Sequence, residues 1–457
     1  MTAKQVRRSV LASLARAVAG AGASSAAVGA VACASGTSQP DRPRTGGTDA
    51  ATGAPPVPTL RRGVKLAFLT DSSAAGAPLV EQVLESWKQK QPDIAMEWLR
   101  PGGQVNLPAM VAAGTPPDVF AVNQDGFAPL ANGGETIALE PYLARDRMEL
   151  NDFFPAGLEM ARWQGKQHGL PRAFNCGVVY TNLSSFDQLG IARQPEKWGA
   201  PGWGWAEFRE VARRLSQDAA DPREARFAAD LLGGIGFFWA FVFSNGGEMF
   251  DATMRSVRLT EPPAVEALQF LADLIHRHKA NPSPEVKQAL GAREVFFNGQ
   301  VAMQFIGASN VNLYQQISQF TWDWRPLPAG RAGARNWGGG FIWGASGKSA
   351  LREEAWAVLR HLTSTESMVT LSTQFFPPRR SAAQAFLDTE AKANRPPHNR
   401  QMILDAMQAA RVRPHHLRYG AVQQVFDEEL GKLWSGEATA QQTTEVIKRR
   451  ADPILQS

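Results

Sequence analysis

Short polar side chains gather in two places that directly follow apolar runs of the chain. The segment Asp71-Ser72-Ser73 follows the run VKLAFL, and Asn123 and Asp125 follow the run DVFAV. Carboxylate, amide and hydroxyl groups form directional hydrogen bonds with sugar hydroxyls, and each unsatisfied group is penalised by roughly 1–3 kcal/mol. The same residue types are also favoured in ordinary turns. These clusters therefore predict either a ligand-binding edge or two simple turns.

Tryptophan is a second residue type that suits a sugar, because its flat ring packs on the C–H face of a sugar ring. Phe238 and Trp239 lie in the run GFFWAFVF, and Trp337 precedes three glycines in NWGGG. Aromatic residues at helical spacing are more often part of a core. The pattern alone therefore favours core packing.

Nucleotide, metal and hydrolytic sites are not supported by the spacing of the residues that they need. GASGKS (344–349) has Ile342 where a phosphate-binding loop has its first glycine, and the glycines at 338–340 lack the last glycine of a dinucleotide loop. His276 and His278 lie two residues apart on an expected helix and point to different faces. A glycosidase needs two facing carboxylates, and the sequence pairs none. We predict no catalytic residue, no metal and no cofactor.

The elements that would position these groups alternate between strand and helix from residue 63 onward. Apolar runs predict strands at 64–69, 94–99 and 118–123, and the segment 78–90 places its apolar side chains on one helical face. Such alternation is typical of an α/β fold with a mostly parallel sheet, whose ligand sites lie at the carboxyl ends of the strands. Residues 123–127 are expected to form a loop at that edge.

The first 32 residues have the layout of an export signal. They contain the pair Arg7-Arg8, an Ala/Gly/Val segment and small residues before Cys33, as in a twin-arginine-like signal. Ala30-Val31-Ala32-Cys33 is similar to a bacterial lipoprotein processing site, which predicts lipidation of Cys33. The segment is a poor membrane-spanning helix, because Ala and Gly predominate and Arg16 interrupts it.

The next segment, 33–62, is rich in Gly, Pro, Ser and Thr and predicts a disordered tether. The net charge of +5 falls to +1 when the four basic residues of 1–32 are removed, so we predict no nucleic-acid partner. Cys176 is the only other cysteine. A lipidated Cys33 therefore leaves no partner for an intramolecular disulfide.

Seven segments, in order, resemble the family 1 extracellular solute-binding proteins of bacterial ABC importers, which include sugar-binding lipoproteins. They are AAGTPPDVFAVN, LEPYL, GKQHGLPRAFNCGVVYTN, GWGWAEF, SNGGEMFD, FFNGQVAMQFIG and EEAWAVLRHLTSTES. The resemblance covers nearly all of 63–457 and implies a two-lobed periplasmic-binding-protein-like α/β fold, each lobe a mostly parallel sheet flanked by helices. Lobe one would comprise 63–173 and 341–384, and lobe two 177–337 and 385–457.

The resemblance also implies three segments that cross between the lobes, near 172–176, 337–341 and 380–384. NWGGG lies in the second crossing, where residues without a Cβ accept backbone rotation as a cleft closes. FIWGAS would then be a buried strand that re-enters lobe one.

Family positions beside the ligand map onto both lobes and the first crossing. They are Asp71, Ser72, Ser73, Asn123 and Asp125 in lobe one, Arg172, Phe174 and Asn175 at the crossing, and Phe238, Trp239, Arg418 and Tyr419 in lobe two. Many sugar-binding members have a tryptophan shortly after AMQFIG, whereas this chain has Ser309 and its neighbours. Either Trp337 supplies the missing stacking surface, or the ligand is not the usual oligosaccharide. The resemblance thus makes Trp239 and Trp337 candidates for stacking on a ligand, with core packing the alternative for Trp239 and hinge packing the alternative for Trp337.

The function implied by the resemblance is capture of a carbohydrate in the interlobe cleft and its delivery to the transmembrane subunits of an ABC permease. The protein would be exported, lipid-anchored in the cell envelope, monomeric and without enzymatic activity. A secreted carbohydrate-active enzyme is one alternative, and a binding protein for a non-sugar solute such as a peptide or polyamine is another. Arg172 and Arg418 leave an anionic sugar open.

Overall fold

A computed structural model gives the fold of the chain from Pro58 to Ser457. The described residues are 58–70, 76–102, 105–219, 221, 223–231, 236–372 and 376–457. The predicted export signal, Cys33, most of the predicted tether and the Asp71-Ser72-Ser73 cluster lie outside the described residues. Within the described part of the chain, no helix is long and apolar enough to cross a bilayer.

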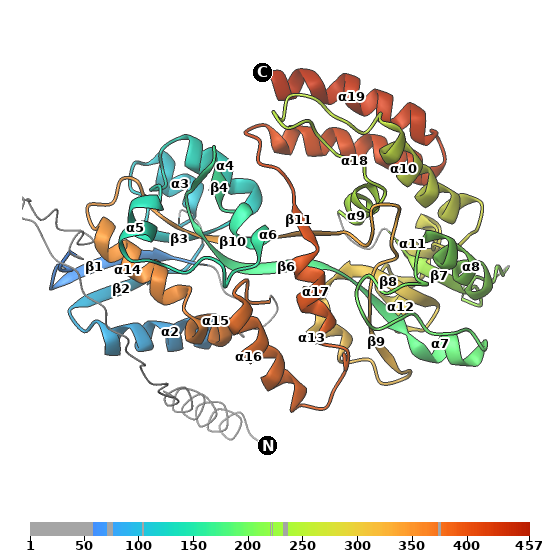
Figure 1. The fold of residues 1–457 in the computed structure, drawn as a ribbon, viewed down its shortest axis with the longest axis horizontal. Helices are drawn as coiled ribbons and strands as arrows, with labels where there is room; N and C mark the ends of the chain where they lie inside the picture. The colour runs from blue at the N-terminus through green and yellow to red at the C-terminus, as the bar shows by residue number, and fades with distance from the viewer. Residues whose placement is uncertain are drawn as a thin grey trace, which may run out of the picture. The chain divides into compact units, whose positions relative to one another are not determined.

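One large sheet runs through the described unit in the strand order β2-β1-β3-β10-β6-β8-β7, with β11 also paired to β10 and β9 also paired to β6 (Figure 1). A small hairpin, β4-β5, is separate. The strands are β1 Val64–Leu69, β2 Ile94–Leu99, β3 Val119–Asn123, β4 Arg162–Trp163, β5 Lys166–Gln167, β6 Leu170–Asn182, β7 Phe227–Asp230, β8 Val301–Gly307, β9 Trp322–Arg325, β10 Asn336–Ala345 and β11 Ala410–Val412.

The long strand β6 joins the two halves of this sheet. Its first half, Leu170 to Cys176, pairs with β10, and its second half, Gly177 to Asn182, pairs with β8 and β9. The β1–β2, β1–β3, β7–β8 and β10–β11 pairs are parallel, whereas β10 and β6 run antiparallel to their other neighbours. The first predicted crossing, 172–176, therefore lies within one continuous strand, up to the point where β6 changes partners.

Helices cover both halves of the sheet. They are α2 Ala77–Lys90, α3 Leu107–Ala112, α4 Gln124–Asn132, α5 Glu140–Arg145, α6 Pro155–Glu159, α7 Leu183–Gln188, α8 Trp205–Leu215, α9 Phe237–Ser244, α10 Pro262–His276, α11 Pro284–Leu290, α12 Glu294–Phe297, η1 Ala308–Asn310, α13 Val311–Tyr314, α14 Arg352–Leu362, α15 Thr365–Leu371, α16 Arg380–Ala391, α17 Met402–Gln408, α18 Tyr419–Ser435 and α19 Ala440–Gln456. α2 and α14 pack with the β1–β3 half, and α8 to α10 with α18 and α19 pack with the β7–β8 half.

Helix α2 shows why the sequence folds in this way. Its apolar residues recur on one face, and Val80, Val83 and Trp87 are buried. Burying each such side chain stabilises the fold by roughly 1.5–3 kcal/mol. The indole Nε1 of Trp87 also donates a hydrogen bond to the carbonyl oxygen of Ile94, 2.8 Å away. This contact ties α2 to the start of β2, and the predicted helix is confirmed.

The predicted loop at 123–127 is wrong, because the helix α4 begins at Gln124. The Asn123 side-chain oxygen accepts a hydrogen bond from the backbone N–H of Gly126 at 2.9 Å and caps the helix. Phe127, one turn further, is fully buried. The predicted lobe boundary at 384/385 lies within the helix α16.

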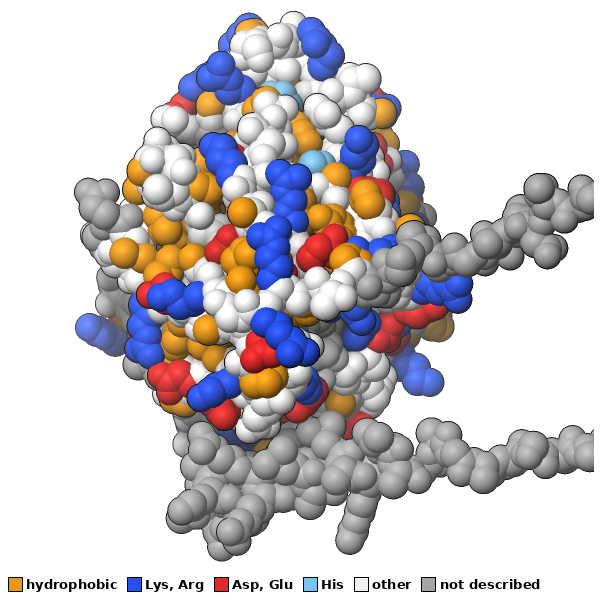
Figure 2. All heavy atoms as spheres, turned by 90° about the vertical axis from the view of Figure 1, so that its left-hand side faces the viewer, with side chains coloured by type: hydrophobic (Ala, Val, Ile, Leu, Met, Phe, Trp, Pro, Cys, Tyr) orange, Lys and Arg blue, Asp and Glu red, His pale blue; other side chains and the backbone are white. Residues whose placement is uncertain are grey.

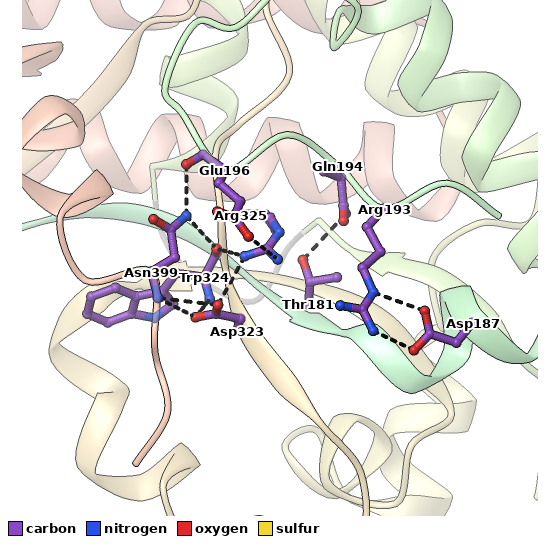
Figure 3. A network of polar contacts seen from close by, with 9 residues as sticks. All are labelled: Thr181, Asp187, Arg193, Gln194, Glu196, Asp323, Trp324, Arg325 and Asn399. Carbon is purple, nitrogen blue, oxygen red and sulfur yellow. Dashed lines mark hydrogen bonds and ion pairs between the residues drawn. The ribbon is translucent and has the colours of Figure 1, made fainter. Parts of the chain in front are cut away.

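A buried polar network fixes the segment before α17 onto β9 (Figure 3). Arg325, only 2% exposed, lies 3.2 Å from a carboxylate oxygen of Asp323 and 3.4 Å from one of Glu196. The Asn399 backbone N–H donates to Asp323 at 3.0 Å, and its side chain donates to the Glu196 carbonyl at 2.8 Å. A buried guanidinium is tolerated only with such partners, so this network holds the returning chain in place.

The end of the unit that carries β1 and β2 faces the viewer in Figure 2, where basic and acidic side chains are interspersed with apolar ones. Lys65 pairs with Glu97 at 2.9 Å, and Arg100 pairs with Glu81 at 2.8 Å. Exposed pairs of this kind contribute about 0–1 kcal/mol each. Mixed charge on this face is typical of a solvated surface rather than of a nucleic-acid interface.

Candidate functional site

Strands β6 and β10 present one partly exposed face where they run side by side. Gly339 of β10 lies opposite Asn175 of β6. Trp337 lies two residues before Gly339, and Gly177 lies two residues after Asn175, so all four residues are on the same face. Gly307 of β8 lies opposite Gly177. We call Asn175, Gly177, Gly307, Trp337 and Gly339 the glycine face. Asn175, Trp337 and Gly339 are partly exposed, whereas Gly177 and Gly307 are buried, as are the residues between the members of this face, such as Phe174 and Cys176.

Close packing explains the glycines of this face. A Cβ on Gly177 would lie 2.9 Å from the Trp337 Nε1 atom, and one on Gly339 would lie 2.9 Å from the Gln124 Oε1 atom. A Cβ on Gly307 would overlap the side-chain amide of Asn175. The predicted rotating crossing NWGGG is therefore the first half of the continuous strand β10. The glycines of this face let the side chains of Trp337, Asn175 and Gln124 pack directly on the backbone.

Trp337 stands at one end of the glycine face, partly exposed. Its ring packs edge-on against Phe237, with ring centres 5.6 Å apart. The preceding Asn336 is buried and its amide donates to the carbonyl oxygens of Gly177 at 3.0 Å and Ala406 at 3.1 Å. Asn336 therefore fixes the strand that carries Trp337, and a rigid backbone is what a stacking ring needs.

Asn175, a member of the glycine face, lies next to the segment after β8. Its side-chain oxygen accepts a hydrogen bond from the Ser309 backbone N–H at 3.0 Å. The structure therefore brings the predicted residues Asn175, Ser309 and Trp337 together. The Asn175 amide group carries two further N–H donors, which suit a hydroxyl-bearing ligand.

A second group of residues joins α4 to the segment 413–419. The Gln124 amide donates to the Arg413 carbonyl at 2.6 Å, and the Arg413 guanidinium lies 2.7 Å from a carboxylate oxygen of Asp125. The guanidinium also lies over the Tyr419 ring, 5.0 Å from its centre. Asp125 and Tyr419, both predicted, thus meet through Arg413, which was not predicted. His415 extends this contact, because its Nε2 atom lies 2.8 Å from the Met160 carbonyl oxygen.

Burial sets the protonation of two of these groups. It raises the pKa of Tyr419 to about 12, so the hydroxyl is protonated at neutral pH and donates to Gln423 at 2.7 Å. Burial also lowers the pKa of His415 below its ordinary value. The imidazole is therefore neutral at pH 7 and donates its Nε2–H to Met160. The segment 413–419 is held by uncharged contacts as well as by its ion pair.

One further pair was missed by the sequence reasoning. Arg411 lies opposite Trp337 in the β10–β11 pairing and makes two hydrogen bonds to Glu248, at 2.8 and 3.1 Å. Its guanidinium also lies 4.1 Å from the centre of the Phe243 ring. The available signal was the alternation Arg411-Val412-Arg413, which an extended segment would send to the same side; in the structure β11 ends at Val412 and Arg413 follows it.

Five other predicted residues are Arg172, Phe174, Phe238, Trp239 and Arg418. Phe174 and Trp239 are core residues, 0% and 1% exposed, and neither ring reaches the surface. Phe238 is half-buried beside Trp239. The Arg172 guanidinium lies 4.8 Å from the ring centre of Trp343, and Arg418 is exposed at the start of α18.

The described residues hold no group of three or more His, Cys, Asp or Glu side chains placed to bind a metal ion. Cys176 is buried, and burial raises the pKa of its thiol well above the ordinary value. A protonated, inaccessible thiol is a poor nucleophile. What the site offers is a partly exposed aromatic ring, the backbone at Gly339, and amide and charged groups nearby.

Comparison with known proteins fits this arrangement. Residues 69–369 match the family described as bacterial extracellular solute-binding protein. The chain belongs to this family. The solute-binding protein is 25% identical over 335 residues to an uncharacterized lipoprotein from the oleD 5′ region of Streptomyces antibioticus, and the alignment covers 69% of each chain.

Solved structures place the fold of this solute-binding protein more closely. It matches the sugar-binding protein MalE of Xanthomonas citri with a TM-score of 0.73 and 18% identity, over 86% of this chain and 97% of MalE. It also matches an ABC substrate-binding protein from Listeria monocytogenes in complex with cycloalternan, with a TM-score of 0.68 and 20% identity, over 86% of this chain and 98% of the other. The predicted two-lobed α/β fold class is confirmed.

Proposed function

We propose that this solute-binding protein captures a carbohydrate in a cleft between two lobes and delivers it to the transmembrane subunits of an ABC importer. The proposed lobes are 63–173 with 341–384, and 177–337 with 385–457. β6 and β10 run between them, and ligand stabilises the closed form because it touches both lobes only there. The protein binds its ligand and does not transform it.

The observation that carries the proposal is the glycine face with Trp337 at its end. Trp337 and Gly339 are partly exposed, so an indole and a short stretch of backbone are accessible there, and an indole packs on the C–H surface of a sugar ring. Asn175 supplies amide donors to hydroxyl groups, while Asp125 and Arg413 supply charged groups that strengthen such hydrogen bonds. The MalE protein and the cycloalternan complex, which share this fold, support the same ligand class.

The proposed setting is the outer side of the cytoplasmic membrane. A lipid on Cys33 anchors the protein, and the tether 33–62 lets it reach the permease as a monomer. The family's extracellular role and the lipoprotein relative support this placement.

Calorimetric and thermal-shift titration of the protein against neutral and acidic oligosaccharides, amino acids, peptides and polyamines tests the ligand class. We expect sugars alone to raise the melting temperature. Trp337→Ala should weaken the sugar that binds by about tenfold or more, the loss expected for one stacked ring. The matched control Trp434→Ala removes a half-buried ring far along α18 and should leave affinity unchanged.

Two outcomes would contradict the proposal. A response to peptides or polyamines with none to sugars would move the protein to the other solute class. If chromatography showed that the protein releases a product from a bound glycoside, the protein would be an enzyme.

A further inference from the structure

A second hollow lies on the half of the molecule that carries β7, the strand at the opposite end of the sheet from β2. It occupies about 740 Å³ between the start of α8, the outer face of α10 and the turn at 329–331. None of its lining residues belongs to the glycine face or to the segment 413–419. We call it the α8–α10 groove and define it by Trp205, Glu207, Gln269, Phe270, Asp273 and Arg331.

The floor of the groove is aromatic. Trp205 and Phe270 lie almost parallel, with ring centres 4.6 Å apart and an angle of 13° between their planes. Both rings are partly exposed, and Val265 lines the floor beside them. The backbone N–H of Trp205 donates to the Ala329 carbonyl at 3.1 Å, which fixes the start of α8 against the turn. The ring pair is therefore held rigidly at the bottom of an open hollow.

The rim of the groove consists of planar polar groups that are already oriented by hydrogen bonds. A Glu207 carboxylate oxygen accepts from the Gly204 N–H at 2.9 Å. A second carboxylate oxygen, on Asp273, accepts from the Gln269 amide at 2.9 Å. Each of these carboxylates therefore keeps an oxygen for an outside donor.

A third group of the rim is formed by Arg331 with its two partners. Its guanidinium pairs with Glu266 and donates to the Asn245 side-chain oxygen at 3.1 Å. Asn245 in turn donates to Glu266 at 3.1 Å. The charge of Glu266 is thereby offset within the protein, and the cluster presents fixed donors and acceptors.

We infer that the α8–α10 groove is a second binding site for a neutral oligosaccharide, separate from the interlobe site. Its size lies within the 300–1,000 Å³ of pockets that bind small ligands, and an apolar floor with a few fixed polar groups is their usual lining. Aromatic rings below and planar amides and carboxylates around them match the C–H faces and hydroxyl rim of a sugar. A long oligosaccharide bound in the groove would stay close to the protein while the interlobe site binds one of its ends.

A cationic peptide is the competing ligand class. The lining carries the carboxylates of Glu207, Glu266 and Asp273 against one guanidinium, that of Arg331. Two of these carboxylates are already bonded to an amide or a backbone N–H, and the third is paired. Planar groups that are held in place favour the directional bonds of hydroxyls over the diffuse attraction of an ammonium group.

Isothermal titration calorimetry of the purified protein with maltoheptaose, cellopentaose and xylopentaose tests the groove. We expect at least one probe to bind with a component that Trp337→Ala leaves intact. Trp205→Ala should weaken that component by about tenfold or more, while Trp205→Phe should keep most of it. The double variant Gln269→Ala/Asp273→Ala removes an exposed bonded pair without touching the ring floor and should weaken the same component.

The outcomes separate this site from the proposed function. Loss of all binding in Trp337→Ala would overturn the second site and leave the interlobe site standing. Trp205-dependent binding with no effect of Trp337→Ala on any sugar would keep the groove and contradict the interlobe assignment. Binding of a Lys-rich peptide in place of all three glycans would overturn the sugar class for the groove.

Discussion

Two neighbouring glycines of β10 offer a direct test of how the glycine face is built. In Gly340→Ala, the new Cβ would lie 3.0 Å from the Ala173 carbonyl carbon, and the carbonyl oxygen lies nearer still. Both atoms are backbone, so the overlap is relieved only if β10 and β6 move apart. In Gly339→Ala, the new Cβ would meet only the Gln124 Oε1 atom at 2.9 Å, the far end of a flexible side chain.

The two substitutions should therefore differ strongly in stability. Overpacking a rigid contact costs roughly 1–3 kcal/mol, while replacing Gly by Ala stabilises by about 0.4–1 kcal/mol through the unfolded state. For Gly340→Ala, the overlap with backbone places the first effect at the upper end of its range, and a net loss of about 2 kcal/mol follows. For Gly339→Ala, the contact is with one side-chain oxygen rather than with backbone, but the buried Gln124 amide is bonded to the Arg413 carbonyl, so we expect a loss that is smaller than that of Gly340→Ala.

Urea unfolding of both variants beside the wild type measures these differences, and titration with the bound sugar measures the site. Gly339→Ala should keep more of the unfolding free energy than Gly340→Ala and lose affinity, because its methyl group occupies a partly exposed position beside the proposed ligand. Gly340→Ala should lose stability first. If Gly340→Ala were as stable as the wild type, or if Gly339→Ala were the less stable variant, the close approach of β10 to β6 would be refuted.

Three further perturbations address other contacts. Hydrogen bonding from Arg145 holds the pKa of Asp146 at about 2, so Asp146→Asn should lower the unfolding free energy by about 2 kcal/mol at pH 7. The difference in unfolding free energy between wild type and variant should shrink as the pH falls from 4 through 2. A difference that stays constant with pH in urea titrations would contradict this prediction. Burial lowers the pKa of His415, so the folded state disfavours protonation of this ring. The stability that the neutral ring allows is present above about pH 6.5 and falls on acidification. His415→Gln should narrow the loss of stability between pH 7 and 5, measured by thermal unfolding. Cys33→Ser should leave the protein unprocessed or released from membranes, and unchanged membrane attachment on fractionation would argue against lipidation.

The sequence predicted the local elements of the fold well. The strands at 64–69 and 94–99 and the helix at 78–90 follow from apolar runs and from one-sided periodicity, which depend on neighbours in the chain. The loop predicted at 123–127 failed for a local reason as well. Asn is favoured both in turns and at the N-cap of a helix, because in both its side chain bonds a following backbone N–H. The residue type alone does not distinguish the two.

The candidate site was harder to predict because it depends on pairing between distant strands. Arg411 meets Trp337 only through the β10–β11 register, and Arg413 reaches Asp125 across 288 residues. Trp239 satisfied every local criterion for a stacking ring, yet it packs in the core with Phe243 and Phe250. Which aromatic residue faces outward is decided by the packing of whole elements.

The position of β10 in the sheet also has a consequence for biosynthesis. β3 ends at Asn123, and its partner β10 begins at Asn336. At 5–20 residues per second, the ribosome needs roughly 10–40 s to supply that partner. During this interval β3 keeps an unpaired edge, which favours mispairing with other chains. The twin arginines predict an export route for folded cargo. Such a route suits a protein in which β3 receives its partner β10 so late in synthesis.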